Sequence, residues 1–463
     1  MARRSLLAIP IVLPLAFATA LAQTVDPGKS LTAPKTDYAL TNVRIVTAPG
    51  RVIERGTVLT RDGRVAAVGA NVTIPAGVVR MDLSGHTVYP GLIDAATSVG
   101  LPSPTRALLT EADAPAGGRG GRAGGGGRGA PLGRGGASPA APVVLPEVDA
   151  GAEAVDMFAP TDAQMKAFRS GGVTTVGLVF NGGLFPGRVG AALTGSRDNS
   201  DQFALRAAVG QQVAFGRNRD SYPGTLIGAL AFVRQAFLDA QYEARVEKAF
   251  KAGAPGARPS NNPFHRALMP AAANEMQTWF VASSERELAR AAAIAKELGL
   301  KSPVFVGSRE GWRAIPALKE SGATAVVSTN WPAVATVTGR MFTAVGMGLS
   351  GTVPDEADST IAREVRANAG ALAKAGVPVA FASYGGNSGT TFRDHIRESI
   401  SAGMSFDDAL RAATVTPAAL LGVTAAVGTI EVGKLANFVV VSGNDLFASG
   451  NPIKHVFVEG RIY

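Results

Sequence analysis

The chain has 463 residues, 46% of them hydrophobic, and it contains no cysteine. These values exclude a disordered chain and a disulfide-stabilised miniprotein, and they allow a large core spread over two or three domains. The formal net charge of +9 is unevenly distributed, because six arginines occupy the N-terminus and one glycine-rich tract. The remainder is only mildly basic, so we expect no nucleic-acid partner. The six are Arg3, Arg4, Arg119, Arg122, Arg128 and Arg134.

Residues 1–22 have the pattern of a secretory signal peptide. Arg3 and Arg4 precede an apolar run at 6–17, and an A-x-A cleavage sequence ends at Ala22. The apolar run is short and contains two prolines, which disfavours a membrane-spanning helix, and no later apolar stretch is long enough to span. We therefore expect a periplasmic or secreted protein with no transmembrane span. General and twin-arginine export both remain open.

Both ends of the remaining chain resemble small β structures. Residues 23–88 contain alternating apolar runs separated by turns at Pro49-Gly50 and Asp62-Gly63. Residues 425–463 contain two further runs, NFVVVSGN and IKHVFVEGRIY. Each end is therefore predicted to be β-rich.

A low-complexity tract at 114–141 interrupts the central region. It consists almost entirely of Gly, Ala, Pro, Arg and Ser, which gives no apolar periodicity to offset the entropy of ordering. We expect a disordered insertion. Its Gly/Arg repeats are similar to RNA-binding segments, but the tract has no aromatic residue for base stacking, so surface or polyanion adhesion is the alternative role.

Elsewhere in residues 89–424, apolar strand-like runs alternate with helical patterns. This alternation is typical of βα units and a parallel sheet. The longest helical patterns lie at 225–251, 284–298 and 359–375. Eight strands are predicted, beginning with the run that starts at Thr87 and ends at Asp94 and continuing at 173–180, 188–195, 204–210, 279–284, 303–308, 324–330 and 377–384.

Three segments resemble the amidohydrolase superfamily. PGLID at 90–94 is similar to the start of its first barrel strand, GTIEVGKLA at 428–436 to its closing turn, and GGVTTVGLVFNGG at 171–183 to its second strand. The resemblance is to imidazolonepropionase-like periplasmic amidohydrolases. It implies a (β/α)8 TIM-type barrel at 89–424, beside a composite β-sandwich built from 23–88 and 425–463.

The resemblance also implies a catalytic metal, but the expected ligands are replaced. The two first-strand histidine positions of the family hold Ala96 and Ser98, and its eighth-strand aspartate corresponds to Tyr384. The fourth-strand bridging position has neither Lys nor Glu available. None of the four histidines is expected at the carboxyl end of a barrel strand, where barrel chemistry occurs, and the one at position 265 is expected in a loop. We therefore predict no cofactor, with Zn as the alternative.

The predicted rim of the barrel is polar and weakly charged. Asp94 with Glu310 could form an acid–base pair of glycosidase type, although structural roles as a strand-end cap and a helix start are favoured. The pocket candidates are Asp94, Thr97, Ser98, Asn181, Ser283, Ser284, Glu310, Asn330, Ser383, Tyr384 and Asn387.

Two functions fit this pattern. The first is a metal-free pseudo-hydrolase that binds a small-molecule ligand or stabilises an active paralogue, as a homo-oligomer or a hetero-oligomer. The second is a hydrolase of C–N bonds other than peptide bonds, acting on cyclic amides or dipeptide-like substrates. The sequence leaves open whether the protein is an enzyme.

Overall fold

The computed structural model describes residues 35–102, 148–195, 203–216, 223–256, 258–331, 356–386 and 389–463. The predicted signal peptide at 1–22 and the Gly/Arg-rich tract at 114–141 lie outside these residues and stay predictions. Within the described ranges, no helix combines the length and the apolar character that a membrane crossing requires.

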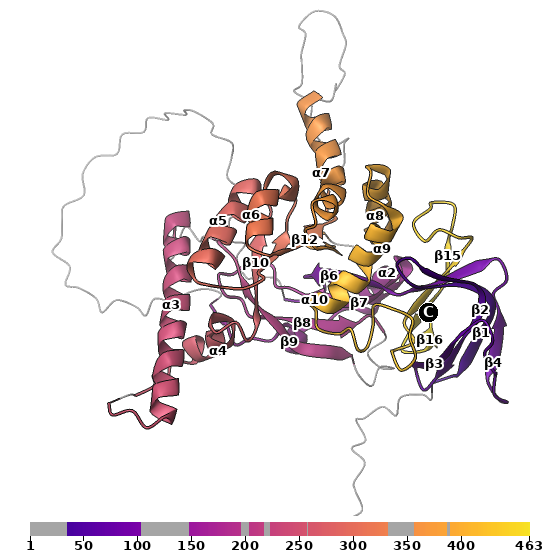
Figure 1. Ribbon diagram of the computed structural model, residues 1–463, viewed down its shortest axis with the longest axis horizontal. Coiled ribbons are helices and arrows are strands. Elements are labelled where there is room, and N and C mark those ends of the chain that lie inside the picture. The colour runs from indigo at the N-terminus through magenta and orange to yellow at the C-terminus, as the bar shows by residue number, and fades with distance from the viewer. Residues whose placement is uncertain are drawn as a thin grey trace, which may run out of the picture.

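Strands from both ends of the chain share one sheet. Its order is β16-β15-β14-β5-β1-β2-β3, and β4 pairs with β1. In Figure 1 the indigo and yellow strands lie together on one side of the molecule. The predicted turns at 49–50 and 62–63 join β1 to β2 and β2 to β3, and Gly50 and Gly63 have the positive φ that these turns require. The strands are β1 (Tyr38–Ala48), β2 (Arg51–Arg61), β3 (Arg64–Gly69), β4 (Val79–Asp82), β5 (His86–Pro90), β14 (Phe438–Ser442), β15 (Ile453–Val458) and β16 (Arg461–Ile462).

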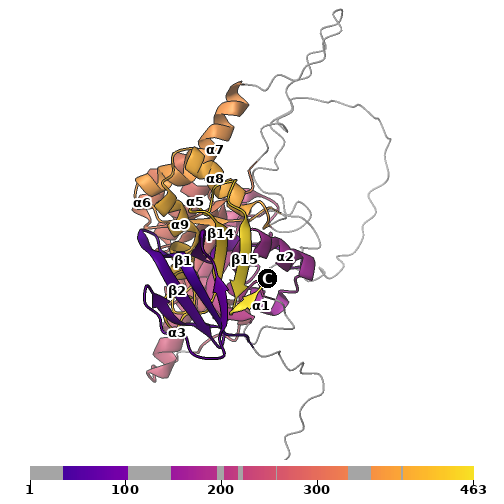
Figure 2. The same cartoon turned by 90° about the vertical axis from the view of Figure 1, so that its right-hand side faces the viewer.

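This terminal sheet is strongly curled. The rings of Tyr38 on β1 and Phe457 on β15 lie 5.7 Å apart, although β5 and β14 lie between the two strands. Strands about 4.8 Å apart in a flat sheet would separate these rings by roughly 14 Å. The curl encloses an apolar cluster that includes Val88 and Phe438, and Figure 2 shows β14 and β15 beside β1 and β2.

A second eight-stranded sheet forms a nearly closed barrel. Its strands follow one another in chain order from β6 to β13, and β13 packs beside β6. Seven of the eight predicted strands are confirmed, whereas the run predicted from Thr87 to Asp94 is divided between β5 of the terminal sheet and β6 of the barrel. The barrel strands are β6 (Leu92–Thr97), β7 (Val173–Leu178), β8 (Arg188–Leu193), β9 (Ala204–Val213), β10 (Gln277–Ala282), β11 (Val304–Gly307), β12 (Thr324–Ser328) and β13 (Val379–Ala382).

The expectation of a wholly parallel sheet is wrong for one strand. β8 runs antiparallel to both β7 and β9, whereas the other described neighbours in this sheet are parallel. The connection at 179–187 is too short for a crossover helix, and Gly182, Gly183 and Gly187 have positive φ values that allow the chain to reverse. The first residue of β8, Arg188, consequently pairs with Gln211 near the carboxyl end of β9.

Helices cover the outside of this barrel. The predicted helices at 225–251, 284–298 and 359–375 are confirmed as α3, α5 and α7, and the side chains of Thr225 and Ser284 cap the first two. The helices are α1 (Ala154–Met157), α2 (Asp162–Ser170), α3 (Leu226–Lys251), α4 (Pro263–Ala272), α5 (Glu285–Glu297), α6 (Ile315–Glu320), α7 (Glu356–Lys374), α8 (Phe392–Ser401), α9 (Phe406–Ala413) and α10 (Val415–Leu420), with a 3-10 turn, η3 (Gly311–Arg313).

The barrel core has two apolar layers. One contains Phe280, Phe305 and Phe381 together with residues of the covering helices. The other contains Trp279 and Val306, and residues of α10 join it. Successive strand residues such as Trp279 and Phe280 fall in different layers because side chains alternate across a strand. Both faces of the barrel sheet are therefore buried.

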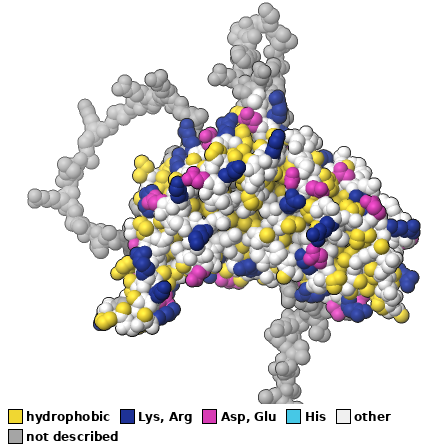
Figure 3. Space-filling view, viewed as in Figure 1, with side chains coloured by type: hydrophobic (Ala, Val, Ile, Leu, Met, Phe, Trp, Pro, Cys, Tyr) yellow, Lys and Arg dark blue, Asp and Glu magenta, His cyan; other side chains and the backbone are white. Residues whose placement is uncertain are grey.

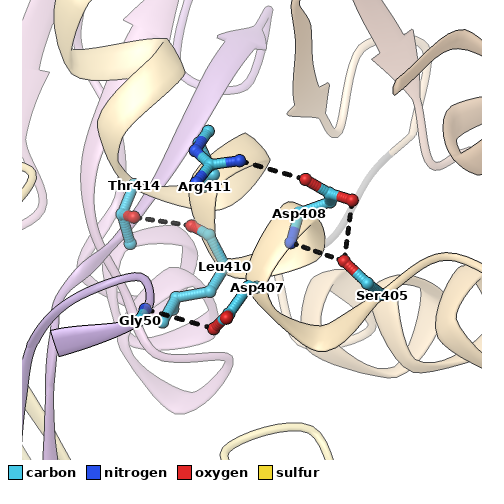
Figure 4. Close-up of polar contacts among 7 residues, drawn as sticks. All are labelled: Gly50, Ser405, Asp407, Asp408, Leu410, Arg411 and Thr414. Carbon is cyan, nitrogen blue, oxygen red and sulfur yellow. Dashed lines mark hydrogen bonds and ion pairs between the residues drawn. The ribbon is translucent and has the colours of Figure 1, made fainter. Parts of the chain in front are cut away.

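Helix α9 connects the barrel to the terminal sheet, as Figure 4 shows. The Asp407 carboxylate accepts a hydrogen bond from the Gly50 N–H (3.2 Å), and the Ser405 hydroxyl caps the helix by accepting from the Asp408 N–H (3.1 Å). Arg411 then pairs with Asp408 at 3.0 Å within the same helix. The β1–β2 turn is therefore held against the start of α9.

Candidate functional site

Asp94, a fully buried candidate, lies inside β6. The expectation that the strand ends at Asp94 is wrong, because β6 continues to Thr97. Oδ1 of Asp94 accepts hydrogen bonds from the backbone N–H groups of Ser383 (2.9 Å) and Ala96 (3.2 Å). Oδ2 accepts from the Ser383 hydroxyl at 2.5 Å. Asp94 therefore joins the first barrel strand to the segment that follows the last one.

Burial dominates the electrostatics of Asp94. Its side chain is fully buried, and burial raises the pKa of this carboxyl to about 7 although the hydrogen bonds from Ser383 and Ala96 lower it. The neighbouring hydroxyls of Ser383 and Thr97 lie 3.0 Å apart and are also buried. These three candidates contact one another within the barrel wall. Asp94 therefore has no direct contact with solvent.

The two positions that correspond to the family's first-strand histidines differ in environment. Ala96 is fully buried and belongs to an apolar cluster of the barrel. Ser98, just beyond the strand, is partly exposed. Neither side chain supplies the nitrogen ligand found in the family motif. The replacement predicted from the sequence thus falls where the barrel wall meets the rim.

Ser283, Ser284 and Glu310 organise the start of α5. The Ser283 N–H donates to Oε2 of Glu287 (2.8 Å), and Ser284 forms a capping box with the same glutamate. Oε2 of Glu310 accepts from the Glu285 N–H (2.9 Å). The carboxylates of Asp94 and Glu310 thus have different partners, and no hydrogen bond between them occurs within the described ranges. Glu310 directly precedes the 3-10 turn η3, but its side chain makes no capping hydrogen bond to that turn and bonds to the start of α5.

Asn330 and Tyr384 link the ends of β12 and β13. Nδ2 of Asn330 donates to the Gly385 carbonyl (2.6 Å), and the Ser328 hydroxyl donates to the Tyr384 carbonyl (2.6 Å). Burial raises the pKa of Tyr384 to about 12, so its phenol is neutral near pH 7. Asn181 is exposed after β7. Asn387 lies outside the described residues.

The histidines are dispersed over four elements. His86 begins β5, His395 lies on α8 and His455 on β15. The expected loop position of His265 is wrong: Asn262 caps α4 and Pro263 begins it, so His265 is helical. His86 and His455 thus belong to the terminal sheet and His265 to a covering helix. The His395 ring lies 5.2 Å from the ring of Trp331, whose indole N–H donates to the carbonyl of Ser328 at the carboxyl end of β12.

The donor set at the strand ends does not fit the metal that the fold implies. Among the described residues it offers hydroxyls, amides and two carboxylates that already accept hydrogen bonds from the protein, Asp94 from Ser383 and Glu310 from Glu285. A zinc centre needs three or more converging protein ligands. Within the described ranges, no group of three or more His, Cys, Asp or Glu side chains is placed to hold a metal.

Sequence reasoning missed the role of Gln212 at the carboxyl end of β9. Its fully buried amide accepts from the Phe180 N–H and donates to the Phe180 carbonyl, both at 2.8 Å. This contact fixes the chain as it leaves β7. The Gln-Gln pair at 211–212, ending an otherwise apolar run, was the available signal for a polar role inside the barrel wall.

Comparison with known proteins gives a match over part of the sequence and a wider match in fold. Residues 318–463 match the Amidohydrolase family model. No curated protein matches the chain. An amidohydrolase from Thermotoga maritima MSB8 is 21% identical with a TM-score of 0.68, over 92% of this chain and 99% of that one.

Two further solved structures have the same fold at lower similarity. A prolidase complexed with N-methylphosphonate-L-proline is 16% identical with a TM-score of 0.52, over 92% of this chain and 99% of that one. Molinate hydrolase is 15% identical with a TM-score of 0.50, over 93% and 95%. Residues 318–463 are thus similar to the amidohydrolase family, and the chain shares its overall fold with an amidohydrolase of known structure.

Proposed function

We propose that this protein is a metal-free pseudo-hydrolase, which binds a small-molecule ligand at the barrel rim or stabilises an active paralogue. The observation that carries the proposal is the state of the first barrel strand. Ala96 and Ser98 stand at the family's histidine positions, and the one carboxylate beside them, Asp94, has both oxygens bonded to protein donors.

The chemistry of the rim supports this proposal. A metal hydrolase acidifies a bound water with a cation held by imidazoles and carboxylates. The strand ends here carry hydroxyl and amide groups such as those of Ser98 and Asn330, which are suited to hydrogen bonding with a neutral polar ligand. Binding without hydrolysis does not require these imidazole and carboxylate metal ligands.

A hydrolase of C–N bonds other than peptide bonds is the second candidate. It is supported by the family match at 318–463 and by the fold shared with a prolidase and with molinate hydrolase. Cyclic amides or dipeptide-like compounds would be the substrates. A metal, if this candidate holds, would have to use ligands other than those at the family's positions.

Metal content and turnover distinguish the two candidates. We expect less than about 0.1 equivalent of Zn, Mn, Fe or Ni per chain after dialysis, because the strand ends lack the required ligands. The protein, with and without added Zn or Mn, is screened against dipeptides, cyclic amides, lactones and β-lactams. Near-stoichiometric metal together with chelator-sensitive turnover would refute the pseudo-hydrolase and establish the second candidate. A metal-loaded amidohydrolase treated in parallel controls for loss of metal during dialysis.

We also propose that the protein acts in the periplasm or outside the cell, on the strength of the signal-like residues 1–22. Protein recovered from the periplasmic fraction should begin near Gln23. An intact N-terminus on a cytoplasmic product would contradict this localisation.

A further inference from the structure

We infer that a pocket between α3 and α4 is a binding site for a small organic ammonium compound. The pocket has a volume of about 340 Å³, within the range of small-molecule sites. It is built from residues of the two covering helices, together with Val148 and Asn262. The inference is independent of the proposed function, because none of the strand-end residues discussed above lines this pocket.

The apolar part of the pocket suits a compact hydrocarbon body. Phe232 of α3 and Phe264 of α4 lie with their ring centroids 6.3 Å apart and both line the pocket, as does Ala236. Phe264 also packs edge-on against Phe185 at 5.3 Å. Because Phe185 is buried, this contact anchors one of the two aromatic walls to the barrel. The walls are therefore supported by packing and do not depend on a ligand.

The polar part of the pocket is acidic. Oδ1 of Asp239 accepts a hydrogen bond from Nε2 of Gln235 (2.7 Å). Oδ2 lies 3.8 Å from Nε2 of His265, which is beyond hydrogen-bonding distance. The Asp239 side chain is 40% exposed, so a ligand can reach it. One carboxylate oxygen at the pocket is thus available to a ligand donor.

The charge of the lining selects the class of ligand. Asp239 and His265 are its titratable residues, and no Lys or Arg is among the described residues that line it. Arg266 lines an adjoining cavity of about 10 Å³, which has room for no more than one water. Because His265 is the only basic residue among the described lining residues, the Asp239 carboxylate favours a positively charged ligand and disfavours an anion.

A primary ammonium group on an aromatic or branched body fits both parts. Its N–H groups can donate to Oδ2 of Asp239 and to Oε1 of Gln235, which remains an acceptor because the amide nitrogen already donates to Asp239. A cation near the faces of Phe232 or Phe264 gains a further cation–π attraction. Nδ1 of His265 is buried and has no hydrogen-bond partner among the described residues. One ring nitrogen beside the pocket therefore makes no hydrogen bond to the described protein.

Calorimetric titration of the full-length protein with phenethylamine tests the inference, and 2-phenylethanol serves as the neutral analogue. We expect saturable binding of the amine, and at least tenfold weaker binding to Asp239→Asn because the carboxylate charge is lost. The alcohol should bind both proteins weakly and equally. Asp62→Asn provides a matched control, since it removes the same charge from the exposed β2–β3 turn and should leave amine binding unchanged.

A second variant tests whether the ligand occupies this pocket. Ala236→Leu places extra carbon atoms at the lining and should abolish amine binding while the melting temperature confirms folding. The inference is overturned if phenethylamine shows no saturable binding up to about 10 mM, or if a folded Asp239→Asn or Ala236→Leu protein binds it as tightly as the unmodified chain.

Discussion

Asp94 is a buried acid whose hydrogen-bond partners give it a structural role without metal ligands beside it. Its two oxygens receive three hydrogen bonds, two of them from Ser383 across the junction between β6 and β13. An uncompensated buried carboxylate would cost several kcal/mol, so these donors make the position tolerable. Asp94 therefore helps to hold β6 against the segment that follows β13.

The raised pKa of Asp94 gives a prediction about stability and pH. The folded pKa is about 7 and the unfolded value is near 3.8, so the folded state binds the proton more tightly. The resulting stabilisation is fully present below pH ~4 and is lost as the pH rises through ~7. Asp94→Asn has no titrating group at this position, so its free energy of unfolding should not show this loss. Between pH 5 and pH 8 we expect the free energy of unfolding of the unmodified protein to fall by about 1–3 kcal/mol relative to that of the variant.

Urea denaturation at several pH values measures the effect as the difference between the two proteins. Asp62→Asn, which changes an exposed turn residue, should follow the pH dependence of the unmodified chain. Parallel curves for Asp94→Asn and the unmodified protein would show that Asp94 does not hold a proton in the folded state.

At the residue scale, the resemblance to the family motif located the residues that stand at its histidine positions, but it did not predict which residues contact one another. Ala96 and Ser98 could be located from the neighbouring PGLID motif alone. The pairing of Asp94 with Ser383 spans 289 positions, and no local pattern encodes a contact of that separation. The same holds for Gln212 and Phe180, whose partnership depends on the chain reversal at β8.

The reversed strand β8 is the main departure at the scale of elements. The strand itself was predictable from its apolar run, and so was its direction. The predicted strands at 173–180, 188–195 and 204–210 leave seven or eight residues between them, too few for a crossover helix. The alternation of strand-like and helical runs along the central region favoured a parallel sheet, whereas these two connection lengths favour a meander.

A pair of introduced cysteines can test the direction of β8, because the chain contains no native cysteine. Ala192 lies opposite Ala204 in the antiparallel β8–β9 pair. Cα atoms of facing residues in such a pair are about 5 Å apart, which suits a disulfide. We expect Ala192→Cys with Ala204→Cys to lose both thiols on mild oxidation, as measured by thiol titration and mass spectrometry.

The control places the second cysteine four residues further along β9, at Ala208→Cys. This position is about 13 Å from the observed partner of Ala192, yet a parallel β8 aligned with the start of β9 would bring it opposite Ala192. Efficient crosslinking of the 192/208 pair, with none for 192/204, would refute the antiparallel arrangement.

At the scale of the whole molecule, the terminal sheet and the barrel are continuous. β5 ends at Pro90 and β6 begins at Leu92, so a single residue separates a strand of one sheet from a strand of the other. Helix α9 adds a second connection through Asp407 and Gly50. Figure 3 shows acidic and basic side chains interspersed over one face of the molecule.

We therefore expect the two parts to unfold together. Phe438 is fully buried in the terminal sheet, and Phe438→Ala should destabilise the protein by about 3–5 kcal/mol through the cavity it leaves. All three tryptophans, Trp279, Trp312 and Trp331, lie in the barrel part of the chain, so their fluorescence reports on the barrel. Their urea transition should shift to lower concentration in the variant.

Phe438→Leu, which retains most of the apolar volume, should shift this transition much less. A tryptophan transition that is unchanged in Phe438→Ala, while circular dichroism shows loss of β structure, would mean that the barrel is stable without the terminal sheet.

The pairing of the two ends was expected from family resemblance. The curl that brings Tyr38 to Phe457 was not, because curvature follows from packing between distant strands.

The terminal sheet combines strands from both ends of the chain, so its strands are synthesised at widely separated times. β5 pairs with β14, and the hydroxyl of Tyr89 donates to the carbonyl of Asn444, 355 positions later. At about 5–20 residues per second, roughly 20–70 s pass before that partner emerges. Throughout this interval β5 exposes an unpaired edge of backbone N–H and C=O groups, the kind of edge that recruits other nascent chains. Recovery of native protein should therefore depend on whether chaperones shield this edge until translation reaches β14.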